Sequence, residues 1–313
     1  MKKITLLGLV CTLLFFPACK NKVKPANDNL KRGVFPAELV NFVPFKGNPV
    51  FKGSGTNSWD QRIRERGFIL FEDNLYKMWY TGYNPVITNQ KYLGYATSPD
   101  GINWTKYSEK PIFDEKWTED MFVVKNCGTY YMYAEGENDV AHFLVSGDGI
   151  QWHERGNLII KSEKGDSIPG PYGTPTVWIE NGKWYLFYER KDAGIWLATS
   201  EDKIHWKNIQ DEPVIKPGPG KYDIGAVAAD QVIKYKGNYY LYYHSTSSLD
   251  WEKPVVPVLW TSSLAMSEDL EHWIKFQGNP IVQSDNSSPI VVFTGNKPLL
   301  YTMHPEVCLY IPR

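Results

Sequence analysis

Short apolar segments separated by turn-forming residues repeat along most of the chain. The clearest unit covers residues 94–113, GYATSPDGINWTKYSEKPIF, where an apolar strand, a Ser-x-Asp turn, a tryptophan and a second strand follow one another. The same order of features returns at residues 143–160, 196–215 and 264–282. Repeats of roughly 45 to 65 residues with four short strands each are typical of β-propellers, so the pattern predicts an all-β fold.

A strand that precedes each repeat gives the number of blades. These strands, which include YKMWYTGY and WYLFYER, begin near Tyr76, Tyr130, Trp184, Tyr239 and Pro298. The first three starting points are 54 residues apart each time, which favours true repetition over chance. The chain is therefore expected to form a five-bladed β-propeller with four-stranded blades.

The two ends of the chain predict how the ring closes. Residues 42–51, FVPFKGNPVF, match the last strand of a repeat, most closely the FQGNPIV segment that ends at Val282. Residues 289–293, 298–304 and 307–311 supply three strands before the sequence ends. We therefore expect the N-terminal strand to complete the last blade, which removes two strand edges that would otherwise be exposed.

The first residues predict export and attachment to a membrane. Lys2 and Lys3 precede an apolar run at 4–16 that is too short for a comfortable membrane span. Cys19 follows a small residue at the end of this run, which resembles a bacterial lipoprotein signal; an ordinary secretory signal is the alternative. The predicted division is a signal peptide at 1–18, a lipid-anchored tether at 19–34 and a catalytic propeller at 35–313. The protein is then a membrane-anchored lipoprotein, periplasmic or on the outer-membrane surface of a bacterium.

Composition narrows the classes of partner and cofactor. The net charge of −1 gives no electrostatic reason to expect nucleic acid as a partner. Cys127 and Cys308 fall in different predicted blades, and no CxxC motif or Cys/His cluster indicates zinc. Neither a disulfide framework nor a metal site is expected. No cofactor is predicted, although the sequence leaves open a structural cation in the central channel.

The repeated turns contain acids for which a structural role is expected. Asp100, Asp148, Asp202 and Asp269 each follow a serine at the second position before them and precede a tryptophan. An aspartate in such a turn accepts hydrogen bonds from its own backbone and fixes the hairpin. These hairpins lie at the outer edge of each predicted blade, away from the axis.

Candidate functional residues lie where the innermost strands begin and the second strands end, because these points meet at one end of the channel. Acids, histidines and arginines gathered there are hard to explain by stability, since buried charge is costly unless it is paired. Glycoside hydrolysis needs an acid and a base on opposite sides of the bond that breaks. The candidate residues are Trp59, Asp60, Arg64, Glu65, Arg66, Glu119, Asp120, Glu135, Glu189, Arg190, Asp230, His244 and His304.

The segment DNLYKMWYTGYN and the following LGYATSPDGINWTKY resemble the five-bladed propeller glycosidases of families 43, 32, 117 and 130. Family 43 enzymes use an Asp base in blade one, an Asp modulator in blade two and a Glu acid in blade three. The resemblance implies that Asp120 is the modulator and that Glu65 or Asp60 takes the place of the base. The expected Glu at the start of blade three is absent, because that segment reads YGTP at 172–175.

Two residues are candidates for the missing acid. Glu189 ends the WYLFYE segment of blade three, and Trp184 and Trp196 of the same blade could shield it from water. His244 is the rival, because YYHSTS resembles a segment of the family 117 and 130 enzymes. The predicted catalytic set is therefore Glu65, Asp120, Glu189 and His244, and the other candidates are expected to bind the carbohydrate substrate.

The preferred interpretation is an exported glycoside hydrolase that acts with inversion on plant or algal poly- or oligosaccharides. One alternative is a glycoside phosphorylase of the family 130 type, in which Arg64, Arg66, Arg190 and His244 would hold phosphate. A glycan-binding lipoprotein without catalytic activity is the other alternative, and the departure in blade three favours it.

Overall fold

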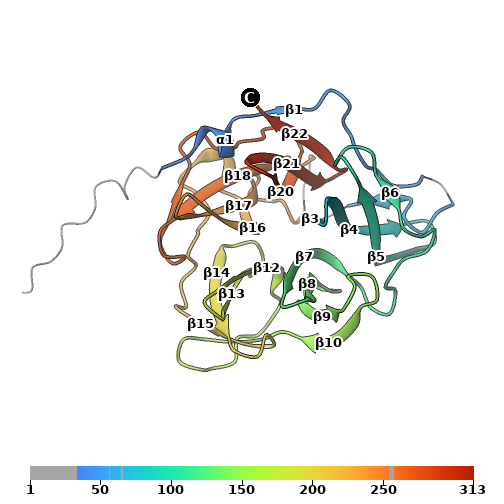
Figure 1. The fold of residues 1–313 in the computed structure, drawn as a ribbon. Helices are drawn as coiled ribbons and strands as arrows, with labels where there is room; N and C mark the ends of the chain where they lie inside the picture. The colour runs from blue at the N-terminus through green and yellow to red at the C-terminus, as the bar shows by residue number, and fades with distance from the viewer. Residues whose placement is uncertain (1–33, 56, 65, 254–256) are drawn as a thin grey trace, which may run out of the picture.

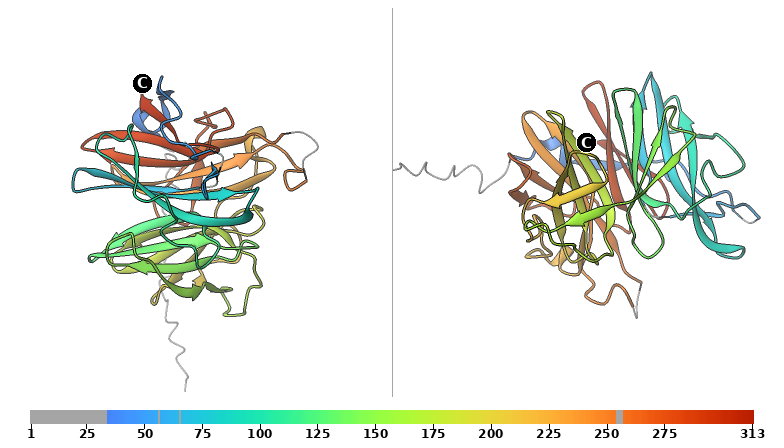
Figure 2. Two further views of the ribbon diagram at one scale, coloured as in Figure 1. Left: turned by 90° about the vertical axis from the view of Figure 1, so that its right-hand side faces the viewer. Right: turned by 90° about the horizontal axis from the view of Figure 1, so that it is seen from below.

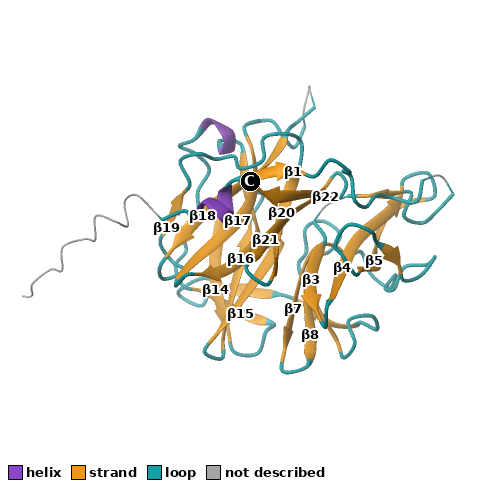
Figure 3. Cartoon of the chain, turned by 45° about the horizontal axis from the view of Figure 1, so that its top comes forward, coloured by secondary structure: helices purple, strands orange, loops and turns teal. Residues whose placement is uncertain are grey.

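The computed structural model describes residues 34–55, 57–64, 66–253 and 257–313. Five antiparallel sheets surround a central axis as the blades of a propeller (Figure 1). Strands and loops make up nearly all of the described chain, and its two helical segments, α1 (Ala37–Val40) and the 3₁₀ turn η1 (Lys221–Asp223), are short (Figure 3). The prediction of an all-β five-bladed propeller is confirmed.

The blades follow one another along the sequence, and each innermost strand lies beside the innermost strands of its neighbours. Blade one contains β2 (Arg62–Ile63), β3 (Phe68–Glu72), β4 (Leu75–Asn84), β5 (Thr88–Ser98) and β6 (Thr105–Lys106). Blade two contains β7 (Glu119–Asn126), β8 (Thr129–Glu135), β9 (His142–Ser146) and β10 (His153–Asn157). Blade three contains β12 (Gly173–Glu180), β13 (Lys183–Glu189), β14 (Ile195–Ser200), β15 (His205–Asn208) and the added β11 (Ile159–Lys161). Blade four contains β16 (Ala226–Tyr235), β17 (Asn238–Thr246), β18 (Trp260–Ser267) and β19 (Trp273–Lys275). Blade five contains β20 (Ser287–Thr294), β21 (Lys297–His304), β22 (Cys308–Pro312) and β1 (Phe42–Pro44).

The expected four strands per blade hold for blades two, four and five, whereas blades one and three each have a fifth, short strand. In blade three this is β11, which comes from the connection after blade two and runs parallel to β15. It covers the outer edge of the sheet, which protects an otherwise unpaired row of backbone groups. The additional strand of blade one, β2, pairs with the far end of the long strand β4.

The N-terminal strand closes the ring as predicted. Strand β1 pairs antiparallel with β22, with Val43 opposite Ile311. Beyond this strand, the Asn48 side chain donates to the Leu309 carbonyl at 2.8 Å and accepts from the Leu309 N–H at 2.7 Å. Asn279 makes the same two contacts with Leu264 in blade four, at 2.9 Å each. The similarity between FKGNPVF and FQGNPIV therefore reflects one structural role.

The Ser-x-Asp turns fix the outer hairpins, which confirms their structural interpretation. Asp100 Oδ1 accepts from the N–H groups of Asn103 at 2.8 Å and Ile102 at 2.9 Å. These donors lower the pKa of the Asp100 carboxyl group. The turns that contain Asp148, Asp202 and Asp269 have the same pattern of bonds.

The tryptophan after each turn packs on an aromatic residue in the second strand of the preceding blade. Edge-to-face pairs of this kind add stability beyond the apolar area that they bury. The pairs are Trp152 with Trp79, Trp206 with Tyr133, Trp273 with Phe187 and Trp104 with Tyr301. The repeated turn therefore joins the blades as well as ending a hairpin.

The junction between blades four and five uses the N-terminal segment instead. Leu39 of α1 is fully buried there, and its carbonyl accepts from the Tyr242 hydroxyl at 3.1 Å. Phe35 packs edge-to-face on Tyr240, whose hydroxyl donates to the Val34 carbonyl at 2.7 Å. The N-terminal segment thus lies between the blades that it closes, as perpendicular views of the ring show (Figure 2).

Two further expectations concern cysteines and the membrane. Cys127 and Cys308 are free thiols, so the prediction that they are not bridged is confirmed. A helix with the length and apolarity of a membrane span is absent from the described part of the chain. The predicted signal peptide, the tether and Cys19 lie outside the described residues.

Candidate active site

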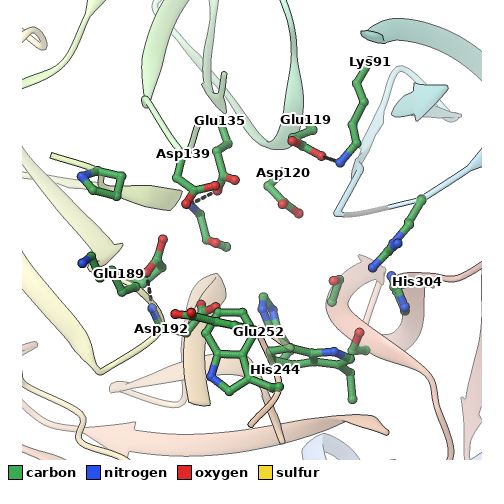
Figure 4. Close-up of a pocket in the computed structure, with 18 residues that line it drawn as sticks. Lys91, Glu119, Asp120, Glu135, Asp139, Glu189, Asp192, His244, Glu252 and His304 are labelled. Atoms are coloured by element: carbon green, nitrogen blue, oxygen red, sulfur yellow. Dashed lines mark hydrogen bonds and ion pairs between the residues drawn. The ribbon is translucent and has the colours of Figure 1, made fainter. Parts of the chain in front are cut away.

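A cavity of about 640 Å³ lies at the end of the channel where the innermost strands begin (Figure 4). This volume is within the range of small-molecule sites, and it accommodates sugar rings. Every blade contributes to its wall, and seven of the side chains are carboxylates. The lining residues are Arg64, Lys91, Glu119, Asp120, Glu135, Asp139, Pro171, Thr174, Glu189, Lys191, Asp192, His244, Trp251, Glu252, Trp260, Ser287, Ser288 and His304.

β-Bulges at the start of the innermost strands direct side chains into this cavity. The register of β7 against β8 shifts by one residue between Glu119 and Phe122, and β12 shifts against β13 between Gly173 and Thr176. The extra residues, Asp120 and Thr174, have φ angles of 45° and 44°. A bulge re-aims a side chain locally, and such bulges are common beside active sites.

Arg66 lies beneath the cavity and joins four blades. Its guanidinium group donates to Thr176 Oγ1 at 2.6 Å and to the carbonyls of Pro175, Ala229, Asp230 and Asp120. Its backbone N–H donates to Asp120 Oδ1 at 2.6 Å. The side chain is fully buried, so one cation of blade one fixes the strand starts of blades two, three and four.

Two buried glutamates approach each other beside Gly173. A methyl group on Gly173 would lie 2.2 Å from Glu189 Oε1 and 2.4 Å from Glu135 Oε2, so a larger residue there would force both carboxylates to shift. Glu135 also accepts from the Thr174 N–H at 2.8 Å, and Glu189 accepts from the Asp192 N–H. Like charges so close in a buried site cannot both ionise readily.

Burial and neighbouring acids raise the pKa values of both glutamates. Burial, followed by the charges of Asp120 and Glu119, raises the pKa of Glu135 well above its usual range. Burial and the charge of Asp192 raise the pKa of Glu189 in the same way. Both effects favour the protonated form of each carboxyl group, as a general acid requires.

Glu119, beside this pair, is held by a cation and an indole. The Lys91 ammonium forms an ion pair with Glu119 Oε2, and the Trp117 indole N–H donates to Glu119 Oε1. Lys91 also lies 5.3 Å from the centre of the Trp117 ring. These contacts fix the orientation of Glu119 and balance its charge.

His244 faces the acids from blade four. Its Nδ1–H donates to Asp230 Oδ1 at 2.9 Å, and Asp230 is fully buried behind it. Burial opposes the charge on the imidazole, but the Asp230 carboxylate outweighs this effect and raises the pKa of His244 to about 9. Burial likewise raises the pKa of Asp192 to about 7, against the opposing charge of His244. At neutral pH, His244 is a cation.

The insertion of blade four forms an aromatic wall. Trp251 packs edge-to-face on Trp260 with ring centres 5.7 Å apart, and Trp260 packs on the His244 ring at 5.4 Å. The backbone N–H of Trp260 donates to Asp285 Oδ1 at 3.0 Å. The cavity therefore has acids on blades two and three opposite aromatic rings on blade four, an arrangement suited to a sugar with a polar edge and an apolar face.

Comparisons with known proteins place this arrangement among carbohydrate-active propellers. No protein-family model matches the chain. A 1,2-beta-oligomannan phosphorylase of Thermoanaerobacter sp. (strain X514) is 28% identical over 226 residues, which are 66% of this chain and 72% of the relative. A solved glycosyl hydrolase from Bacteroides ovatus has a TM-score of 0.67 at 17% identity and covers 90% of this chain and 96% of its own. The beta-1,2-mannobiose phosphorylase from Listeria innocua has a TM-score of 0.68 at 15% identity, with coverage of 87% and 96%.

The chain has the fold of the propeller glycosidases and glycoside phosphorylases. The resemblance drawn from the sequence is therefore confirmed at the level of the fold. These matches support activity on glycosides and leave hydrolysis and phosphorolysis as alternatives.

The fold explains the departure from the family pattern in blade three. Where family 43 enzymes have a glutamate at the strand start, this chain has the segment YGTP at 172–175. The space beside Gly173 is filled by the carboxylates of Glu135 and Glu189, which come from the ends of β8 and β13. A carboxylate is thus present at this point but comes from different positions in the sequence.

Most of the residues singled out in the sequence lie at this cavity. Arg64, Glu119, Asp120, Glu135, Glu189, His244 and His304 line it, and Asp230 supports His244 from behind. Glu65 lies outside the described residues, so its predicted role as base stays a prediction.

Four of the predicted substrate contacts, Trp59, Asp60, Arg66 and Arg190, do not line this cavity. Asp60 is buried in an ion pair with Lys106, and Arg66 is buried among backbone carbonyls. Trp59 is stacked on Tyr80 with ring centres 6.0 Å apart, and the Arg190 guanidinium lies 5.3 Å from the centre of the Trp196 ring. Each side chain is engaged in packing or ion pairing within its own blade or at the axis.

Several lining residues were missed in the sequence. Asp139 and Trp251 are in loops, Lys91 lies within β5, and Trp260 begins β18. Only the length of the insertion after β17 could have indicated the two tryptophans. Concerning metals, no group of three or more His, Cys, Asp or Glu side chains in the described ranges is arranged to hold an ion.

Proposed function

We propose that this protein is a glycoside hydrolase that cleaves O-glycosyl bonds of oligo- or polysaccharides from plants or algae. The observation that carries the proposal is the buried pair of Glu135 and Glu189 beside Gly173, in a cavity large enough for a sugar. Stability offers no reason to place two carboxylates so close together in a buried site.

The glutamate pair acts as the general acid. The two carboxylates share a restricted, buried space, and burial and nearby acids raise both pKa values, which favours a protonated carboxyl group in this pair. The protonated member donates its proton to the glycosidic oxygen as the bond to the leaving sugar breaks. The charges of Asp120 and of the neighbouring glutamate keep the pKa of Glu135 raised before the proton is transferred.

Asp120 is the carboxylate that activates water. Its Oδ1 accepts from the Arg66 N–H at 2.6 Å, which fixes the orientation of the carboxylate at the cavity. Water that loses its proton to Asp120 attacks the anomeric carbon, and inversion is the outcome that the resemblance to these families implies. Glu65, the base expected from the sequence, is the second candidate for this role.

His244 serves as a fixed cation. A pKa of about 9 makes it a poor proton donor near neutral pH, where a well-matched acid has a pKa close to the working pH. Its position opposite Asp192 suits hydrogen bonding to a sugar hydroxyl instead. The proposal therefore favours the glutamate pair over His244 as the acid.

Phosphorolysis is the second candidate, and the names of two relatives favour it. A phosphate dianion needs cations at the site of attack. In this cavity Lys91 is paired with Glu119 and His244 with Asp230, and the seven carboxylates of the wall outnumber its cations, which also include Arg64 and Lys191. Water, which carries no charge, is the more suitable nucleophile here.

The test is to compare Glu135→Gln and Glu189→Gln with the parent on a panel of oligosaccharides that includes β-1,2-mannobiose, with and without phosphate. Loss of turnover by about 100-fold or more in either variant, with binding retained, supports the proposal. Glu212→Gln, an exposed acid on an outer loop, is the matched control and should act like the parent.

Three outcomes would contradict the proposal. If His244→Ala is inactive while both glutamine variants remain active, His244 is the acid. If cleavage requires phosphate and yields a sugar phosphate, the protein is a phosphorylase. If sugars bind but the parent cleaves none of them, the protein is a glycan-binding module.

We also propose that the protein is exported and lipid-anchored through Cys19. The support is the sequence alone: two lysines, a short apolar run and a cysteine that follows a small residue. Placement outside the cytoplasm suits an enzyme that meets polysaccharide fragments before their uptake.

A further inference from the structure

A second cavity of about 730 Å³ lies beside the first, between blades one and five. Arg64 and His304 line both cavities, so the two are adjacent parts of one surface. The remaining wall is formed by residues from the segment after β1, the start of blade one and the loop after β21. These are Lys52, Gly53, Ser54, Gly55, Gln61, Arg62, Ile63, Tyr83, Pro305 and Glu306.

The charges of the two cavities are opposite. The first has seven carboxylates, whereas the second has Lys52, Arg62 and Arg64 with Glu306 as the one acid in its described lining. Lys52 and Arg62 are exposed, and neither forms an ion pair with any residue that the structure describes. Two cations at a concave surface are thus available to an anionic ligand.

Local contacts hold this wall in place. A methyl group on Gly53 would lie 2.4 Å from the Gln61 carbonyl oxygen, so the two backbones are in close contact. The Lys106 ammonium bonds both Ser54 Oγ and the buried carboxylate of Asp60. The segment that carries Lys52 is therefore attached to the segment that leads to Arg62, which keeps the two cations on one surface.

We propose that this second cavity binds an oxyanion carried by the glycan, either the carboxylate of a uronic acid or a sulfate ester. The inference deepens the proposed function and rests on a glycan occupying the first cavity. Arginine recognises carboxylate and sulfate through paired N–H donors, and lysine adds a point charge. The repulsion by the carboxylates of the first cavity directs the anionic ring toward the second one, which places a neighbouring sugar over Glu135 and Glu189.

The experiment measures binding on a glycan array that holds uronate-bearing and sulfated oligosaccharides beside their neutral counterparts. Glu135→Gln serves as the background, since it leaves bound glycans uncleaved. Lys52→Ala with Arg62→Ala is compared with Lys161→Ala and Arg155→Ala, a Lys and an Arg that are exposed on β11 and β10. Both double variants lose the same charge.

The background protein should prefer acidic glycans, and the Lys52/Arg62 variant should lose about tenfold in affinity for them while neutral glycans are unaffected. The Lys161/Arg155 variant should keep the preference. Equal binding of acidic and neutral glycans by the background protein would overturn the proposal, as would an equal loss in both variants.

Titration with inorganic phosphate distinguishes the other source of an oxyanion. If phosphate binds to the parent and not to the Lys52/Arg62 variant, and if cleavage of neutral glycans depends on phosphate, the cavity holds free phosphate and the glycan-borne oxyanion is excluded. Array binding does not require turnover, so a preference for acidic glycans without cleavage would leave this inference intact while refuting hydrolysis.

Discussion

Replacing Arg66 with methionine tests how the cavity is held together. Methionine fills a similar volume but removes the donors to one hydroxyl and four backbone carbonyls. A buried polar group left without a partner costs about 1–3 kcal/mol, whereas removal of a buried guanidinium regains some of its own desolvation cost. For the loss of one partner in a buried charged network we expect a decrease of about 3–5 kcal/mol in the free energy of unfolding.

The loss should also depend on pH. Arg66 interacts with the charge of Glu135, so it favours the ionised form of that carboxyl group. Burial has already raised the pKa of Glu135 above its unfolded value, and the substitution raises it further. A carboxyl group with a raised pKa binds more protons in the folded state, so stability falls as the pH rises through the interval between the two values. The variant should therefore lose more stability at pH 8 than at pH 5.

Urea unfolding of the parent and Arg66→Met at both pH values measures these effects. A fall of roughly 10 °C in the melting temperature should accompany the change for a domain of this size. Arg155→Met, on the surface of β10, should stay within about 0.5 kcal/mol of the parent. A change below about 1 kcal/mol for Arg66→Met, or one that is the same at pH 5 and pH 8, would refute the reasoning.

Three further predictions concern the site, the closure of the ring and the anchor. Gly173→Ala should reduce turnover by about 100-fold without removing a catalytic group, because the methyl group displaces two carboxylates; steady-state kinetics test this, and parent-like activity would contradict the crowded pair. Deletion through Phe51 should destabilise the propeller far more than deletion through Arg32, because only the longer deletion removes β1 and α1; equal melting temperatures would contradict closure by the N-terminal strand. Cys19→Ser should move the protein from the membrane fraction to the soluble fraction, and unchanged fractionation would count against lipidation.

The fold could be predicted from the sequence because a propeller repeats the same short arrangement of strands and turns. The turn around Asp100 and the strand that begins near Tyr76 recur with small variations, and each copy strengthens the interpretation of the others. The closure of the ring by the N-terminal strand could be predicted for the same reason. Asn48 and Asn279 make equivalent contacts in different blades, so the segments around them have similar sequences.

The site was only partly predictable, because it depends on features that do not repeat. Glu135 and Glu189 were found because they end equivalent strands, but their mutual approach depends on Gly173, whose importance lies in the absence of a side chain. Arg66 could not be distinguished from Arg64 by sequence, although one is buried at the axis and the other is exposed at the cavity.

The most direct test of the central claim is proton NMR of the anomeric signals during incubation of the parent protein with oligosaccharides in phosphate-free buffer. The account predicts that a glycosidic signal disappears while a free reducing sugar forms with the inverted anomeric configuration first. It also predicts that the same spectra do not change over the same period with Glu135→Gln or Glu189→Gln. Turnover by both glutamine variants at the parent's rate, or turnover by the parent only after phosphate is added, would contradict hydrolysis by the glutamate pair.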